Sequence, residues 1–406
     1  MFASDRFSST ALAALLVALG LSACSGASSG GNGSTVVSTG GSTGSGPMSA
    51  GSGTSGAGAS GAGGSGGGAG SGSTGGACAV TPQSLAVQTQ NQVPSLLYVD
   101  DTDTLYAAPW GGVASDYYVM NLQTGTGNVV NANSSVNFGA QGALRLYAYQ
   151  GGVYLVTGSG IESIPANGGA PVTIFSSAAG ILAVDFDQNL AFYSDVNGDV
   201  GSFDLTAAPG ASPTLLGHRK DLGYQAVVLS VDSTAVSLVN VNGSAYRIPR
   251  DGSPATLLYD GPQETLTGAA SDGTRLYVHA YRLDGTPHAG VGQLSLSATN
   301  QKAFQWLPDA RAINDAYSNQ SSEPPPLLLD SLILTPLANP QNGFSDSVNF
   351  TRYVRATGAS CVFLTANEPY GVYATAGGHS YAWVEISANS SGQTIGYSLR
   401  WVTFPN

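Results

Sequence analysis

The sequence predicts an all-β domain made of a repeated unit of short strands, over residues 78–406. Short alternating or apolar runs are separated by Gly, Asn, Asp and Pro, which is the pattern of antiparallel strands joined by turns. A turn followed by a hydrophobic pair recurs along the domain, and in most units a second turn and a further strand follow. No amphipathic helical pattern competes with this reading, so we expect very little helix.

The hydrophobic pair marks the first strand that we can place in each unit. It occurs at Leu105-Tyr106, Val153-Tyr154, Ala191-Phe192, Val236-Ser237, Leu276-Tyr277, Leu332-Ile333 and Val372-Tyr373. Its spacing varies from 38 residues, between Val153 and Ala191, to 56 residues, between Leu276 and Leu332. Units of this length with four strands each are typical of β-propeller blades. We therefore expect seven blades, with six or eight blades, or one or two β-sandwiches, as alternatives.

The next strand of the unit also repeats. It occurs at Val119-Met120-Asn121-Leu122, Ser163-Ile164-Pro165, Ser202-Phe203-Asp204-Leu205, Arg247-Ile248-Pro249, Gln293-Leu294-Ser295-Leu296 and Trp383-Val384-Glu385-Ile386. The sixth unit is longer than the others because of Pro308–Pro326 and Asn339–Ser347. Insertions of this kind usually form loops on one face of a repeat domain, where binding surfaces lie.

We predict an export signal at the N-terminus, over residues 1–23. Ala11–Leu21 is apolar but too short to span a bilayer comfortably. The segment Leu21-Ser22-Ala23-Cys24 resembles the lipobox of bacterial lipoproteins. This resemblance implies that Cys24 becomes the lipid-carrying mature N-terminus, and that Ser25, in place of aspartate, directs the protein to the outer membrane. An ordinary signal peptide with a chance cysteine, or a buried apolar helix, is the alternative.

Residues 24–77 follow as the lipidated cysteine and a flexible linker. From position 25 the segment is almost entirely Gly, Ser, Ala and Thr and contains no charged residue. Such a chain cannot bury enough apolar surface to offset the entropy lost on ordering. We therefore expect a tether that holds the domain away from a membrane.

Cys78 and Cys361 are the two cysteines left after Cys24. In an oxidising compartment they form a natural disulfide pair, which would join the two ends of the domain. Two unpaired buried thiols are the alternative.

Over about residues 95–406 the chain resembles divergent TolB-like propellers of the bacterial envelope. The resemblance rests on the repeat spacing and the turns quoted above, and no invariant motif fixes a subfamily. It implies a closed ring in which each blade buries its faces against its neighbours.

The charge balance narrows the choice of partner. The net charge is −12, and all charged residues except Asp5 and Arg6 lie in 78–406. An acidic surface argues against nucleic acid or anionic lipid as the partner. We expect contact with the membrane through the lipid anchor, a protein or glycan partner in the envelope, and a monomer.

A candidate metal site is Asp195, Asn197 and Asp199, because oxygen side chains at alternate positions begin many calcium loops. The loop lacks the glycine and glutamate of a complete calcium motif. The corresponding place in the next unit is Asn240-Val241-Asn242-Gly243-Ser244, and Asn-Gly is a hairpin signal. A plain hairpin is therefore the stronger interpretation, and we expect no cofactor other than this calcium.

The aspartates that precede the repeated strands are the other candidates for chemistry. Asp100, Asp101 and Asp103 form one group and Asp185 and Asp187 another, and paired carboxylates can serve acid–base work. Their position before each strand favours a role in turns. The four histidines are His218, His279, His288 and His379. They show no zinc-like spacing, although a long-range site at His279 stays open.

These observations favour a lipid-anchored envelope protein, periplasmic or surface-exposed, whose propeller is a non-enzymatic binding or scaffolding module. The alternative is a propeller enzyme, such as a hydrolase, lyase or dehydrogenase, whose active residues come from different blades. A purely structural envelope protein is a third possibility.

Overall fold

The computed structural model divides the chain into two units, Met1–Gly75 and Gly76–Asn406. All described residues belong to the second unit. They are 82–87, 94–111, 113–139, 143–166, 168–223, 226–240, 243–261, 264–282, 289–307, 327–329, 332–338, 347–355, 357–367, 374–388 and 394–404.

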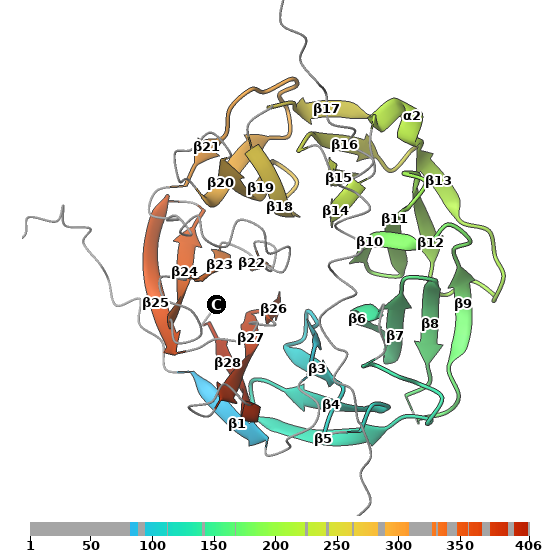
Figure 1. The fold of residues 1–406 in the computed structure, drawn as a ribbon, viewed down its shortest axis with the longest axis vertical. Coiled ribbons are helices and arrows are strands. Elements are labelled where there is room, and N and C mark those ends of the chain that lie inside the picture. The colour runs from blue at the N-terminus through green and yellow to red at the C-terminus, as the bar shows by residue number, and fades with distance from the viewer. Residues whose placement is uncertain are drawn as a thin grey trace, which may run out of the picture. The chain divides into compact units, whose positions relative to one another are not determined.

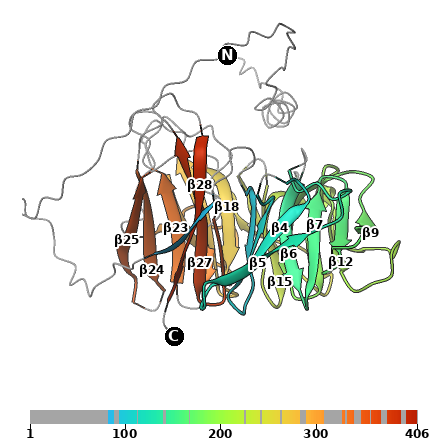
Figure 2. The ribbon, with the colours of Figure 1, turned by 90° about the horizontal axis from the view of Figure 1, so that it is seen from below.

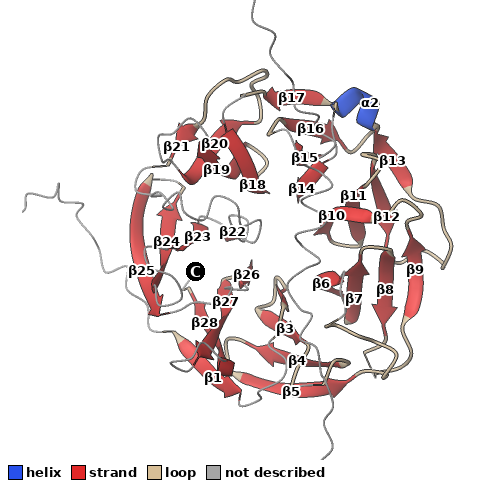
Figure 3. Ribbon diagram, in the orientation of Figure 1, coloured by secondary structure: helices blue, strands red, loops and turns tan. Residues whose placement is uncertain are grey.

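The described strands form seven four-stranded antiparallel sheets that follow one another around a ring (Figures 1 and 2). Nearly all regular structure in the described residues is strand (Figure 3). The prediction of an all-β propeller is confirmed, and the ring excludes the β-sandwich alternatives. We number the sheets as blades 1 to 7 in chain order.

Each blade runs from its first strand, at the inside of the ring, to its fourth strand at the rim (Figure 1). Blade 1 contains β2 (Leu96–Val99), β3 (Thr104–Ala108), β4 (Asp116–Asn121) and β5 (Thr126–Asn131). Blade 2 contains β6 (Ala143–Tyr149), β7 (Gly152–Thr157), β8 (Gly160–Ile164) and β9 (Val172–Ser176). Blade 3 contains β10 (Ile181–Asp187), β11 (Leu190–Asp195), β12 (Val200–Asp204) and β13 (Thr214–Gly217).

The next three blades follow the same order. Blade 4 contains β14 (Ala226–Val231), β15 (Ala235–Asn240), β16 (Ala245–Pro249) and β17 (Thr256–Tyr259). Blade 5 contains β18 (Glu264–Ser271), β19 (Arg275–Arg282), β20 (Ala289–Ser295) and β21 (Gln305–Trp306). Blade 6 contains β22 (Leu327–Leu329), β23 (Leu332–Ala338), β24 (Ser347–Val354) and β25 (Ala359–Asn367).

Blade 7 joins the two ends of the domain. It contains β26 (Ala374–Gly377), β27 (Ser380–Ala388) and β28 (Thr394–Thr403) from the C-terminal end, and β1 (Gln83–Val87) from the N-terminal end. β1 pairs antiparallel with β28 and forms the outermost strand. This pairing closes the ring with backbone hydrogen bonds, so the last blade needs strands from both ends of the chain.

One short helix, α2 (Arg219–Leu222), lies between blades 3 and 4 among the described residues. Within that part of the chain, no helix combines the length and apolar character needed to cross a membrane.

In blades 1 to 6 the repeated pairs of the sequence lie in the second strand. In blades 1 to 5 they face the predicted next strand in register, as Leu105 opposite Met120, Val153 opposite Ile164, Ala191 opposite Phe203, Val236 opposite Ile248 and Leu276 opposite Leu294. The same cross-strand apolar contact therefore recurs from blade to blade, which is why the repeat was visible in the sequence.

The seventh unit was assigned one strand out of phase. Val372 and Tyr373 lie outside the described residues, and the second strand of blade 7 is β27, which contains Trp383–Ile386. Alternating apolar residues look alike in every strand of a blade, so periodicity could not reveal which strand they belong to. Most of the two expected insertions in blade 6, 308–326 and 339–346, also lie outside the described residues.

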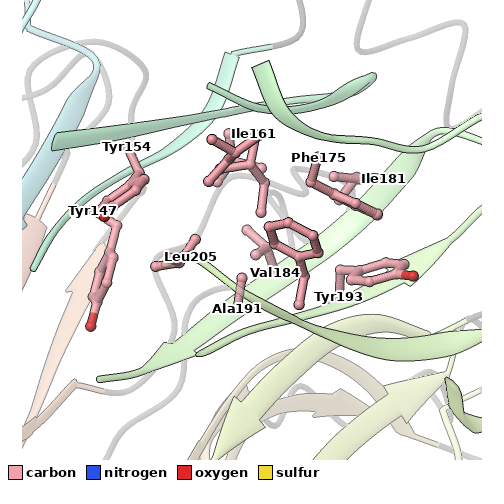
Figure 4. Packing of buried hydrophobic residues seen from close by; sticks show 12 residues of the cluster. Tyr147, Tyr154, Ile161, Phe175, Ile181, Val184, Ala191, Tyr193 and Leu205 are labelled. Atoms are coloured by element: carbon pink, nitrogen blue, oxygen red, sulfur yellow. The ribbon is translucent and has the colours of Figure 1, made fainter. Parts of the chain in front are cut away.

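The hydrophobic core lies between neighbouring blades. Figure 4 shows the cluster between blades 2 and 3, where side chains from both sheets point toward one another. Phe175 of blade 2 packs against Tyr193 and Phe203 of blade 3, with ring centroids 4.8 and 5.0 Å apart. Each sheet thus buries its faces only with the help of its neighbours.

Candidate binding surface

The turns between first and second strands lie at one end of the sheets, which we call the turn face. Asp100, Asp232 and Asp272 each begin such a turn. The Oδ1 atom of Asp272 accepts hydrogen bonds from the Thr274 N–H, the Thr274 hydroxyl and the Arg275 N–H, at 2.9, 2.8 and 2.7 Å. Asp232 makes the same three bonds to residues 234 and 235. The structure agrees with the turn-forming role expected for these aspartates.

Arginines on the turn face join neighbouring blades through these and other carboxylates. The Nη1 atom of Arg145 in blade 2 lies 2.9 Å from Oδ1 of Asp185 in blade 3. The Arg145 guanidinium carbon also lies over the Phe186 ring, 5.7 Å from its centroid. Arg250 of blade 4 reaches back to Asp187 of blade 3 at 2.6 Å. The Asp185–Asp187 pair is therefore neutralised by cations from two different blades. Sequence reasoning missed these arginines because their partners lie in other repeats.

Contacts of this kind lower the pKa of two turn-face carboxylates, Asp232 and Asp272. Burial raises the pKa of Asp272, but hydrogen bonds from Thr274 and Arg275 and the Arg355 guanidinium at 2.9 Å outweigh it and lower the pKa to about 2. For Asp232, hydrogen bonds from Thr234 and other neighbours likewise outweigh burial and lower the pKa. A carboxyl group that stays ionised at neutral pH cannot serve as a general acid. Asp232 and Asp272 each hold a turn, and Asp272 also pairs with Arg355 of blade 6.

Asp103 joins blade 1 to blade 7. It is only 1% exposed and has a φ of 59°. Its Oδ1 accepts the His379 N–H at 2.8 Å, and its Oδ2 accepts the Gln123 amide at 2.8 Å. Burial raises its pKa, but hydrogen bonds from Gln123, Ser380 and His379 outweigh burial and lower it. The carboxylate therefore stabilises the contact between blades 1 and 7, where the ring closes.

The first strands of blades 1 to 3 each contribute one aromatic side chain, Tyr98, Tyr147 and Phe186, to a row of packed rings. The ring centroids of Tyr98 and Tyr147 are 4.9 Å apart. The Tyr147 ring stacks on the Phe186 ring, with the centroids 4.1 Å apart. The Tyr147 hydroxyl donates to the Gln188 carbonyl at 2.7 Å. Burial raises the pKa of Tyr98 and Tyr147 well above the usual range. These aromatic rings contribute to the packing between blades.

The Asp195–Asp199 segment is the hairpin between β11 and β12. The Asp195 Oδ1 atom accepts the Asp199 N–H at 3.0 Å, and Gly198 has a φ of 86°. Asp199 also contacts His218, with Oδ1 and Nδ1 3.2 Å apart, and sequence reasoning had not connected these two residues. Asn197 is exposed. In the part of the chain that the structure describes, no group of three or more His, Cys, Asp or Glu side chains is placed to hold a metal. Calcium binding stays a prediction.

The remaining predicted residues are spread over the domain. Cys361 lies in β25 of blade 6 and is disulfide-bonded. Cys24 and Cys78 lie outside the described residues, so the pairing of Cys78 with Cys361 stays a prediction. His279 is 2% exposed in β19, and its register neighbours are Gly268 and Val291. Blade 5 thus holds this histidine inside its sheet.

A cavity of about 580 Å³ lies at the outer part of blade 5. Its lining is mostly polar and consists of Arg275, Gln293, Leu294, Ser295, Gln301, Ala303, Phe304 and Gln305. We call this cavity the blade 5 groove. Its volume falls in the range of ligand pockets, about 300 to 1,000 Å³. In the sequence, the two nearby glutamines Gln301 and Gln305 were the signal that could have indicated this groove.

Comparison with known proteins finds similarity to solved structures alone. No family model matches the chain, and no curated protein matches it. Among solved structures, the WD40 domain of Neurospora crassa Pan2 has 8% identity, covering 77% of this chain and 90% of that chain, with a TM-score of 0.47. The N-terminal domain of Nup159 has 11% identity, covering 78% and 94%, with a TM-score of 0.44. The computationally designed Ika8 protein has 12% identity, covering 77% and 97%, with a TM-score of 0.45. The seven-sheet ring itself defines the chain as a β-propeller protein.

Proposed function

We propose that this chain is an exported, lipid-anchored protein of the bacterial envelope whose propeller acts as a non-enzymatic binding or scaffolding module. The lipobox-like segment before Cys24 and the uncharged Gly/Ser-rich stretch at 25–77 support the anchor and the tether. The outer membrane is the proposed location, with a protein or glycan of the envelope as the partner of a monomeric propeller.

The observation that carries the binding role is the contrast between the turn face and the blade 5 groove. The carboxylates best placed for chemistry on the turn face hold turns and join blades, as Asp232 and Asp272 show. The groove instead presents an arginine and exposed polar side chains in a concave site. A rigid closed ring with such a site is suited to holding a partner.

Crosslinking in the native cell, followed by affinity capture of the protein, tests the role. The control is a chain that lacks residues 78–406 but keeps the anchor and linker. A protein or glycan captured only with the full chain is the expected result. Capture of the same molecules by both chains would contradict the binding role of the propeller.

The anchor is tested separately by metabolic labelling with palmitate. The full chain is expected to incorporate label, and Cys24→Ser is expected to abolish it. Equal labelling of both chains would overturn lipidation at Cys24.

A further inference from the structure

We propose that the rim of blade 1 binds an extended, basic segment of a partner protein as an added β-strand. The site is the outward side of β5, which we call the blade 1 edge. This inference rests on the proposed binding function, to which it adds a second site and a class of partner. It is carried by the exposure of β5, by its contrast with other rim strands and by the charge of its blade.

β5 is exposed along most of its length at the rim of the ring (Figure 1). It is the end strand of its sheet, and in the part of the chain that the structure describes no further strand pairs with it. The Thr126 N–H donates to the Thr124 hydroxyl at 3.4 Å, and Gly168 lies against the Asn131 carbonyl oxygen. The open part of the edge therefore runs over residues 127–130.

The end strands of blades 2 to 4 carry features that discourage strand addition. Their ladders with the third strands each contain a β-bulge or a similar irregularity, whereas β4 and β5 pair in unbroken register. Pro171 and Pro213 stand directly before β9 and β13, and Pro254 stands two positions before β17. Bulges, prolines and charged side chains protect the edges of sheets in natural proteins. β5 has none of the three.

Blade 4 shows how an end strand of this ring accepts a further segment. The chain between β20 and β21 crosses to β17, where the Asn300 N–H donates to the Leu257 carbonyl at 3.0 Å. The Gln301 N–H donates to the Leu258 carbonyl at 2.9 Å, and Gln301 forms a parallel bridge with Tyr259. The protein's own chain thus occupies the edge of β17. On blade 1 the described residues supply no such segment.

The chemistry of the blade 1 edge selects a polypeptide as its occupant. In an end strand, alternate residues direct their N–H and C=O groups away from the sheet. Another extended backbone presents donors and acceptors with the same repeat, about 7 Å for two residues, and a sugar does not. In such strand addition the main-chain hydrogen bonds supply affinity, and alternate side chains supply specificity.

The side of β5 that faces blade 7 offers an apolar surface to these alternate side chains. Val129 is 45% exposed and lies opposite the half-buried Tyr118 in register. The Tyr118 ring stacks on the Trp110 ring, with centroids 4.3 Å apart, in the cluster shared with blade 7. A Cβ at Gly127 would lie 2.7 Å from the Tyr118 hydroxyl, so this glycine lets the ring lie against the strand beside Val129. Apolar side chains at alternate positions of the partner would extend this surface.

The charge of blade 1 selects a basic partner. The charged residues between positions 82 and 139 are all aspartates, namely Asp100, Asp101, Asp103 and Asp116, and this stretch contains no Lys or Arg. An acidic surface attracts a segment that carries lysines or arginines and repels an acidic one. The net charge of −12 also opposes pairing of the edge with a second copy of this chain.

Fluorescence anisotropy with the purified full chain tests the inference. The probe is the labelled peptide Lys-Thr-Val-Thr-Val-Thr-Val-Thr-Lys, which is apolar at alternate positions and basic at both ends. Saturable binding is expected. Two matched peptides should each bind at least about tenfold more weakly. One is N-methylated at every internal residue, which removes its N–H donors, and the other has glutamates in place of both lysines.

Val129→Lys is the protein variant and Val172→Lys is its matched control. Val129 on β5 is 45% exposed and Val172 on β9 is 46% exposed, so both variants add the same charge at equally exposed rim positions. Val129→Lys is expected to weaken probe binding about tenfold, because it removes the apolar surface beside Tyr118 and places a charge on the edge. Val172→Lys should bind as the parent does. Thermal unfolding of both variants shows that lost binding is local.

No binding of the probe, equal binding of either matched peptide, or equal binding by Val129→Lys and Val172→Lys would overturn the inference. In sedimentation equilibrium, a dimer of the full chain that Val129→Lys dissociates would assign the edge to a second copy and overturn it as well. The outcome is separable from the capture experiment above. A cellular partner captured equally by Val129→Lys refutes the blade 1 edge and leaves the binding module standing, whereas probe binding without a cellular partner does the reverse.

Discussion

Replacing Asp103 with alanine should weaken the closure of the ring between blades 1 and 7. The carboxylate accepts the His379 N–H and the Gln123 amide, both at 2.8 Å, at a site that is 1% exposed. A hydrogen bond to a charged group contributes about 1.5 to 3 kcal/mol, and its loss leaves a polar group with no acceptor. The φ of 59° adds about 1 kcal/mol, because alanine is disfavoured in the left-handed region where aspartate is tolerated.

The expected loss for Asp103→Ala is therefore about 3 to 4 kcal/mol in the free energy of unfolding. Asp103→Asn is the matched control, since asparagine keeps one acceptor oxygen and also tolerates a positive φ, and should cost about 1 kcal/mol. Urea unfolding of the full chain with its disulfide intact, followed by tryptophan fluorescence, measures both. If the two variants lost the same stability, or Asp103→Ala lost less than about 1 kcal/mol, the account of ring closure would be refuted.

Two further predictions concern acid stability and strand packing. The pKa of Asp272 is lowered to about 2 in the folded state, so its stabilising effect is present above the unfolded value of about 4 and is lost as the pH falls toward 2. Asp272→Asn should flatten the fall in unfolding free energy over this window, and an unchanged slope would contradict the prediction. In β8, a Cβ at Gly160 would lie 2.1 Å from the Phe175 carbonyl oxygen, whereas one at Gly158 meets nothing within 4 Å. Gly160→Ala should therefore cost about 2 kcal/mol more than Gly158→Ala in urea unfolding, and equal costs would show that β9 can move aside.

Much of the candidate surface could be placed from the sequence. The Asn-Gly signal predicted a hairpin at residues 195–199, and Asp100 was expected to form a turn, and the structure has both. Turn chemistry is encoded within a few residues, because a side chain bonds to the backbone of its near neighbours. The blade 5 groove was missed, since it depends on where the chain between β20 and β21 travels and not on a local pattern.

The sequence by itself determined the all-β class, the repeat and the cross-strand apolar pairs, because alternation and turn residues act over short distances. Only the tertiary structure decided which strands complete blade 7, which arginine meets which aspartate, and where the ring is fastened. The bond from the His379 N–H to Asp103 spans 276 positions, and that from the Trp401 indole N–H to the Leu122 carbonyl spans 279. Such contacts form only because the closed ring brings the two ends of the domain together. No local sequence pattern predicts them.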